Sequence, residues 1–104
     1  RKLVQSFPDT TEEPHFEKTS FRVRNRIFVT YDASNSKAVV KLSEIDQSVF
    51  AAGAHLAIYP VGNKWGKQGW TVIDMKKIHP DLLKDAVTTA FCTVAPQKLA
   101  EQVR

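Results

Sequence analysis

Five short segments rich in β-branched and aromatic residues most constrain how this 104-residue chain can fold. These segments are residues 19–24, 27–32, 38–42, 55–60 and 69–75. Their composition predicts β-strands, and turn-forming residues separate them. Segments with helical spacing lie before, between and after them. The order predicts an α+β fold, in which a single antiparallel sheet of about five strands has helices packed on one face. At this length the chain forms a single domain, residues 1–104.

A tight hairpin is predicted between the first two strands, because Asn25 tolerates a positive φ. With the two-residue turn Asn25-Arg26, the residues that share one face are Phe21, Val23 and Phe28. The opposite face then carries Arg22, Arg24, Ile27, Val29 and Tyr31. A three-residue turn would instead align Ile27 and Val29 with Phe21, since a slip by one residue reverses the faces of a strand. The shorter turn is the preferred interpretation.

The N-terminal and C-terminal parts of the chain are predicted to be helical. Residues 1–7 form a helix that ends at Pro8, and residues 8–18 form a polar connector rich in acidic residues. Pro80 begins a long helix at a position that proline favours, and residues 97–104 add a terminal helical turn or two. The apolar side of the long helix consists of Leu83, Val87, Ala90, Phe91 and Val94.

A shorter helix is predicted to begin after Ser43, whose hydroxyl can cap it, with Asp46 three residues later. Gly53 suits the end of this helix. Its predicted apolar stripe consists of Ile45, Val49 and Ala52. The decapeptide of residues 61–70, which joins the last two strands, is predicted to be a loop and contains both tryptophans.

The composition is that of a globular protein, with 42% hydrophobic and 25% charged residues. The apolar segments are too short to cross a membrane. The one cysteine, Cys92, cannot form an intrachain disulfide, so a reducing cytoplasm is the expected compartment.

No residue pattern in this sequence indicates a catalytic site. Metal ligation is not supported by the spacing of the three histidines, His15, His55 and His79. Cys92 lies near the end of a helix and is interpreted as a small buried hydrophobe. Glu12 and Glu13 lack an apolar wall that would raise a pKa for acid–base work. We therefore predict a protein that is not an enzyme and has no catalytic residues, metal or cofactor.

The basic and aromatic residues are the best functional candidates. The chain has 15 Lys and Arg against 11 Asp and Glu, a formal net charge of +4. Arginine can hold a phosphate with two hydrogen bonds, and an indole offers a flat surface for stacking. Two basic turns projecting from one sheet would suit a duplex or a single strand. The candidate nucleic-acid-binding residues are Arg22, Arg24, Arg26, Lys64, Trp65, Lys67 and Trp70.

Each candidate also has a plainer interpretation. Arginines and lysines on turns are often simply solvated charges, and Trp70 opens a strand, where packing into the core is preferred. Trp65 is as consistent with exposure as with burial. The alternative function is a module that binds a protein or ligand, or forms a homodimer, through the surface of Trp65 and Trp70.

Residues 12–32 and 59–99 resemble the MmcQ/YjbR-like family of small bacterial proteins. The pattern consists of a His-Phe pair at 15–16, F-R-V at 21–23, I-F at 27–28, W-G-x-x-G-W at 65–70, D-L-L at 81–83 and A-P-Q-K-L at 95–99. Asn25-Arg26 replaces the usual glycine-lysine, and His79 stands where an acidic helix cap is common. The first departure keeps both the turn and its charge, and the second weakens the helix cap without affecting any site.

The resemblance implies an α+β fold grouped with the CyaY-like proteins and likened to a double-wing DNA-binding module. The family is commonly described as predicted DNA-binding, and no catalytic residues define it. Its relation to frataxin-type proteins also suggests an iron site. Such a site would require a ridge of carboxylates on one helix, whereas the acids here are scattered or lie within residues 8–18. The resemblance therefore favours nucleic-acid binding over iron binding.

Overall fold

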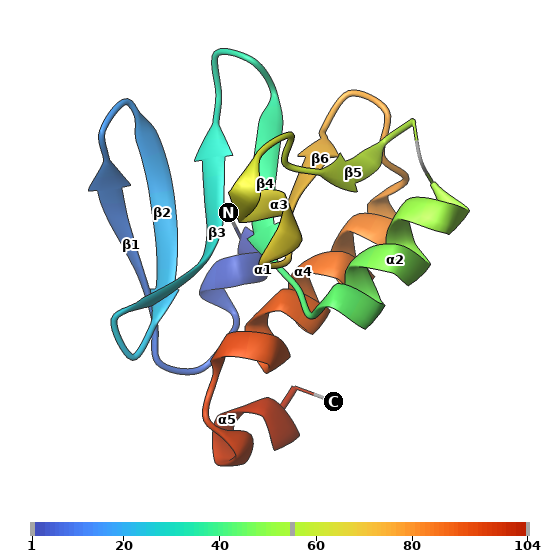
Figure 1. The fold of residues 1–104 in the computed structure, drawn as a ribbon. Helices are drawn as coiled ribbons and strands as arrows, with labels where there is room; N and C mark the ends of the chain where they lie inside the picture. Colours follow the sequence, from blue (N-terminus) through green and yellow to red (C-terminus); the bar gives the residue numbers. More distant parts are fainter. Residues whose placement is uncertain (1, 55, 104) are drawn as a thin grey trace.

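In the described part of the chain, six antiparallel strands form one open sheet in the order β1-β2-β3-β4-β6-β5 (Figure 1). The computed structural model describes residues 2–54 and 56–103. The strands are β1 (Thr10–His15), β2 (Lys18–Val23), β3 (Arg26–Asp32), β4 (Lys37–Lys41), β5 (Ile58–Pro60) and β6 (Trp70–Asp74). The helices are α1 (Lys2–Gln5), α2 (Glu44–Gly53), α3 (Lys64–Lys67), α4 (Pro80–Val94) and α5 (Gln97–Glu101). The predicted α+β fold is confirmed, with one strand more than expected.

The main core lies between α4 and the centre of the sheet. Phe28 of β3 and Phe91 of α4 are fully buried, with ring centroids 5.4 Å apart, and Phe7 packs on Phe91 at 4.8 Å. Burying each such ring stabilises the fold by roughly 1.5–3 kcal/mol. The predicted apolar side of α4 is confirmed at its centre, where the fully or nearly fully buried residues are Val87, Ala90 and Phe91. Leu83 and Val94 are partly buried at its ends.

The hairpin between β2 and β3 has a different turn from the one predicted. Val23 pairs with Arg26, so Arg24 and Asn25 form the turn. Both turn residues have positive φ, 50° for Arg24 and 68° for Asn25. Two central residues with positive φ match the right-handed twist of the flanking strands. Asn25 therefore has the predicted backbone, but the turn is Arg24-Asn25 instead of Asn25-Arg26.

A register shift in β3 also changes the predicted faces. Arg22 pairs with Ile27, whereas its neighbour Phe21 pairs with Val29, so Phe28 is an extra residue in β3. Such a bulge lets two successive residues, Phe28 and Val29, be buried on the same side. The β3 residues whose predicted faces are wrong are Val29 and Tyr31. The three-residue turn places Val29 correctly but puts Ile27 on the wrong face.

The predicted connector of residues 8–18 is wrong, because it contains the edge strand β1. This strand pairs with β2 from Thr10, opposite Val23, to His15, opposite Lys18. Proline is tolerated on an edge strand, where its missing N–H interrupts no ladder on the solvent side. The polar sequence of β1 is thus ordered by its partner strand and not by its own strand propensity.

Helix α2 begins as predicted but buries a different side. The hydroxyl of Ser43 accepts a hydrogen bond from the backbone N–H of Asp46 at 3.0 Å, which confirms the cap. The predicted apolar stripe is wrong. Ile45 is 78% exposed, Val49 is 66% exposed and Ala52 is also exposed. The buried side chain on this helix is Gln47.

Two further segments differ from the prediction. Strand β5 covers only Ile58–Pro60 of the expected residues 55–60, of which His55 lies outside the described residues. Residues 61–70, expected to be a loop, contain the single helical turn α3. None of the described helices combines the length and apolar character that crossing a membrane requires.

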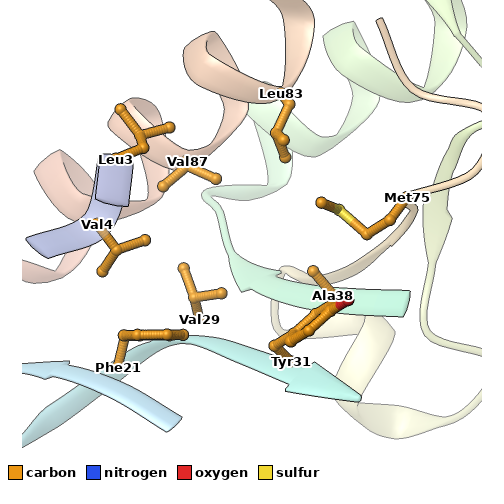
Figure 2. A pocket seen from close by; sticks show the side chains of 9 residues that line it. All are labelled: Leu3, Val4, Phe21, Val29, Tyr31, Ala38, Met75, Leu83 and Val87. Carbon is orange, nitrogen blue, oxygen red and sulfur yellow. The ribbon is translucent and has the colours of Figure 1, made fainter. Parts of the chain in front are cut away.

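An apolar cavity of about 370 Å³ lies between α1, α4 and the sheet. Its lining residues are Leu3, Val4, Phe21, Val29, Tyr31, Ala38, Met75, Leu83 and Val87. Figure 2 shows the side chains of α1 and α4 facing those of the strands across this space. The hydroxyl of Tyr31 is the polar side-chain group of this lining, so the cavity belongs to the apolar layer under the helices.

Candidate functional site

The sheet face opposite the helices, called here the open face, carries the basic residues of the central strands. In β2, Phe21 and Val23 are buried against the helices, so Arg22 between them points to the open face. Pairing adds Lys37 opposite Asp74, and Lys41 opposite Trp70. Alternation along strands places these side chains away from the core. The open face therefore carries both basic side chains and the indole of Trp70.

A hollow of about 390 Å³ lies on this face. It is called here the tryptophan hollow, and its lining residues are His15, Lys18, Ile27, Thr30, Val39, Val61, Trp65 and Trp70. A neighbouring hollow of about 330 Å³, called the Asp32 hollow, is lined by Lys18, Thr30, Asp32, Asn35, Lys37, Val39 and Val72. The shared residues are Lys18, Thr30 and Val39. The two hollows thus form a continuous surface with Lys18 at their junction.

Two glycines shape the connection that carries Trp65 and Trp70. A Cβ on Gly66 would lie 1.9 Å from the backbone oxygen of Val61, and a Cβ on Gly69 would lie 1.8 Å from that of Leu42. Gly69 also has a φ of 101°, which side chains rarely allow. The glycines of W-G-x-x-G-W are therefore required by close backbone packing.

A buried glutamine holds the same connection against α2. The side-chain amide nitrogen of Gln47 lies 2.9 Å from the Gly66 carbonyl oxygen, 3.2 Å from that of Trp70 and 3.0 Å from the Thr71 hydroxyl. At the other end, Asn63 caps α3 by accepting a hydrogen bond from the N–H of Trp65 at 2.9 Å. These contacts fix the position of α3 over the open face.

The two indoles line the tryptophan hollow. Trp65 is 49% exposed, and Trp70 is half-buried outside the buried core cluster. The preferred sequence interpretation of Trp70 as a core residue is therefore wrong. The ammonium of Lys41 lies 5.6 Å from the Trp70 ring, and that of Lys64 lies 5.6 Å from the Trp65 ring. Both contacts have the distance of a cation–π interaction.

The predicted basic residues fall into two groups. Arg24 forms an ion pair with Asp9 at 3.0 Å, and Arg22 lies 3.8 Å from a carboxylate oxygen of Glu13. Arg26, Lys64 and Lys67 have no carboxylate partner within the described residues. The second group is therefore the better source of uncompensated positive charge.

The two predicted turns emerge at the same end of the sheet. Antiparallel pairing places the Arg24-Asn25 turn at the end where β4 finishes and β6 begins. Figure 1 shows the β2–β3 turn in the lower half of the view, and the β1–β2 and β3–β4 turns at the top. Strand β4 separates the two predicted turns in the sheet order. They share an end without being immediate neighbours.

Sequence reasoning missed the site residues around the β1–β2 turn. His15 and Lys18 line the tryptophan hollow from this turn. Between them, Phe16 is 94% exposed with a φ of 59°, and its ring lies 4.9 Å from the His15 ring. Two signals pointed here: the His-Phe pair of the family pattern, and the even spacing that places Lys18 on the same face as Arg22.

The Asp32 hollow is less suited to an anion, because Asp32 lines it and its lining residue Lys37 pairs with Asp74. Hydrogen bonds from the side chains of Asn35 and then Ser34 lower the pKa of Asp32. The N–H of Lys76, with a further contribution from Lys37, lowers the pKa of Asp74. Lys37 lies 3.2 Å from Asp74 and compensates its charge. Asp32 keeps its negative charge at neutral pH, so an anion is favoured at the tryptophan hollow.

The remaining chemistry-bearing residues have structural roles. His79 accepts a hydrogen bond at Nδ1 from the N–H of Asp81 at 3.1 Å and so caps α4. Cys92 is half-buried, more exposed than expected, with its sulfur 3.8 Å from the Ala100 carbonyl oxygen. Among the described residues, no three His, Cys, Asp or Glu side chains converge in the way that a metal site requires.

A family model named YjbR matches residues 5–93. The chain belongs to the YjbR family. No curated protein matches it significantly. Among solved structures, this YjbR-family domain is similar to the Deinococcus radiodurans protein DR2400, which has the family-model domain DUF419. The TM-score is 0.80 at 16% identity, and the match covers 99% of this chain and 83% of that one. At this identity the similarity establishes the fold alone.

Proposed function

We propose that this YjbR-family domain binds nucleic acid weakly, and mainly through phosphates, on the open face of its sheet. The observation that carries the proposal is the position of Lys18, Lys64 and Lys67. None of them forms a salt bridge within the described residues, although Lys18 is near enough to Asp32 to contribute to the lowering of its pKa. Lys18 and the helix α3 border a hollow lined by indoles. Proteins that bind single-stranded nucleic acid combine cations, which contact the backbone, with flat aromatic surfaces, on which bases stack. The role is one of binding in the cytoplasm, without catalysis.

The centre of this binding surface is at α3 and the tryptophan hollow, and not at the hairpin arginines. Ion pairs with Asp9 and Glu13 partly neutralise Arg24 and Arg22. Arg26 remains available at the tip of the same hairpin. We therefore expect the hairpin to add long-range attraction, with the main phosphate contacts on the α3 side.

Phosphate-dominated binding has a clear signature in salt. Each cation that contacts a phosphate releases bound counterions, so affinity falls steeply as salt increases and depends little on base sequence. Removing one such cation lowers the slope of log K against log salt by roughly one unit.

The test compares two double variants of equal charge change by fluorescence anisotropy with a labelled DNA duplex. Lys64→Gln with Lys67→Gln is expected to weaken binding at low salt and to reduce the salt slope by roughly two units. Lys84→Gln with Lys98→Gln removes two exposed cations from α4 and α5 and is expected to leave the slope unchanged. Identical binding curves for both double variants would contradict the proposed surface.

A second candidate function is a module that binds a protein or ligand. It is favoured by the apolar part of the tryptophan hollow, which consists of Ile27, Val39, Val61, Trp65 and Trp70. The exposed Ile45 and Val49 of α2 offer further apolar surface. Binding or dimerisation through such surface would be insensitive to salt. Gel filtration over a range of protein concentration, at low and high salt, separates this function from nucleic-acid binding.

A further inference from the structure

We infer that the tryptophan hollow is a stacking site for unpaired nucleobases, so that the preferred ligand is single-stranded nucleic acid. In this arrangement one base stacks on Trp65 in the hollow and another on Phe16, whose ring contacts that of the lining residue His15. Lys18, which lines the hollow at the Phe16 end, meets a connecting phosphate with its ammonium. This inference rests on the proposed function and names its ligand.

Phe16 is exposed and has an unfavourable backbone conformation. Its φ of 59° belongs to the left-handed region, where a bulky side chain is rare, and its ring is 94% exposed. The ring therefore gains almost no stability from burial to offset the unfavourable backbone. Residues held in this way cluster at functional sites. Stacking on a base would use the ring that folding leaves in water.

Aromatic groups border the hollow from opposite ends of the sheet. His15 and Lys18 form the last pair before the β1–β2 turn, whereas Trp70 opens β6 at the other end. All three line the same hollow. The hollow consequently runs along the open face instead of forming an isolated pit. Its volume of about 390 Å³ lies in the range of small-molecule sites.

A single strand presents the base faces that such a surface can contact, whereas a duplex does not. In a duplex, the faces of the bases are stacked on each other and only their edges are exposed in the grooves. The floor of the hollow includes the aliphatic side chains of Ile27, Val39 and Val61. These groups contact the face of a base but read no hydrogen-bonding edge. Unpaired bases therefore fit the hollow, with little preference for sequence.

The experiment measures binding of a labelled strand of about ten nucleotides, alone or annealed to its complement, in DNA and RNA forms. Phe16→Asn and Trp65→Ala are each expected to lower single-strand affinity by roughly 5- to 100-fold, which is the effect of losing one stacked base. Asn tolerates the backbone of residue 16, so the loss reports the ring and not the turn. Duplex affinity is expected to change by less than about twofold.

Two ring-preserving controls, Phe16→Tyr and Trp65→Phe, are expected to retain most of the single-strand affinity. Leu56→Ala removes a side chain that is 69% exposed and does not line the hollow, and is expected to have no effect. Circular dichroism on every variant confirms that the fold is intact before binding is compared.

The outcomes separate this inference from the proposed function. Salt-dependent binding that is equal for duplex and single strand, and unchanged in Phe16→Asn and Trp65→Ala, overturns the stacking site but supports phosphate binding by the open face. Absence of binding to either form at low salt overturns both. A single-strand preference that disappears with the two rings supports both, and the DNA and RNA arms then show which backbone is accepted.

Discussion

The two basic turns at one end of the sheet are built in opposite ways. The Arg24-Asn25 turn depends on its own backbone, with two consecutive positive φ values and an exposed ion pair to Asp9. The β5–β6 connection, residues 61–69, is instead held by groups far away in sequence. These are the buried amide of Gln47 and the backbone of Leu42. The hairpin turn is therefore local, whereas the connection depends on the tertiary structure.

This difference bears on function. A stacking surface is useful only if its position is fixed, whereas a phosphate can be attracted by a mobile cation at a distance. The rigid support is found under Trp65, and the locally determined turn carries arginines that carboxylates partly neutralise. If this comparison is correct, changes in the connection should affect stability much more than changes in the turn.

The largest effect is expected from Gly69→Ala. The added Cβ meets the Leu42 oxygen at 1.8 Å, at a φ of 101° that alanine rarely adopts. We expect a loss of about 3 kcal/mol or more in the free energy of unfolding, measured by urea denaturation. The matched control is Gly62→Ala, where the new Cβ meets nothing within 4 Å. The control should change stability by less than about 0.5 kcal/mol.

Equal stabilities of these two alanine variants would show that the backbone of residues 61–69 adjusts to the added Cβ at little cost. The connection would then give Trp65 no rigid support. The comparison uses the same substitution in the same connection. It therefore separates the effect of backbone packing from the general effect of replacing glycine.

The second-largest loss of stability is expected from Gln47→Leu, which keeps the approximate volume of the side chain but removes its amide group. The Gly66 and Trp70 carbonyls each keep one backbone hydrogen bond, from Gly69 and Val61 respectively. The loss should therefore be about 2 kcal/mol and not the sum of three hydrogen bonds. Ser48→Ala, at the adjacent exposed position, serves as the control in the same urea titration. A loss below about 0.5 kcal/mol for Gln47→Leu would mean that α2 does not support the connection.

The contrast between local and non-local determinants also explains how much could be predicted from the sequence. The Ser43 cap and the buried side of α4 around Val87 and Phe91 follow from neighbouring residues, and both were predictable. Gln47 was not, because its acceptors lie 19 to 24 residues away. The bulge at Phe28 was also hidden, since a one-residue shift leaves the local strand pattern intact.

For the candidate site, too, the locally determined features could be predicted and the non-local ones could not. The sequence identified the cations and indoles of residues 64–70 but not the hollow, which needs side chains from several strands. It also missed β1, because an acidic segment with a proline resembles a connector until β2 provides a partner. Consequently the position of His15 and Lys18 in the lining of the hollow could be identified only from the fold.

A smaller effect of opposite sign is expected from Asn25→Gly in the hairpin turn. Glycine adopts a φ of 68° without steric cost, and is the residue preferred at this position of the turn. We expect a gain of about 0.5 kcal/mol in thermal or urea unfolding. Asn35→Gly is the contrasting control. Residue 35 lacks a positive φ and donates a 2.7 Å hydrogen bond to Asp32, so this variant should lose about 1 kcal/mol. A loss in both variants would indicate that the hairpin turn also depends on the side chain of Asn25.

The smallest stability effect is expected for the ion pair of Arg24 with Asp9. The two side chains are 61% and 50% exposed, so solvent screens the pair and Arg24→Ala should change stability by less than about 0.5 kcal/mol. Asp9→Asn removes the carboxylate while tolerating the φ of 55° at residue 9.

The same ion pair gives the sharpest test of the functional contrast, because Asp9→Asn frees Arg24 without changing the turn. If the hairpin contributes only attraction at a distance, this variant should elute from a heparin column at a higher salt concentration than the unmodified protein. Its stacking-dependent preference for single strands should stay unchanged. If Asp9→Asn instead strengthened single-strand binding as much as the loss of Trp65 weakens it, the hairpin would be a primary contact. The assignment of the two turns to attraction and to stacking would then be wrong.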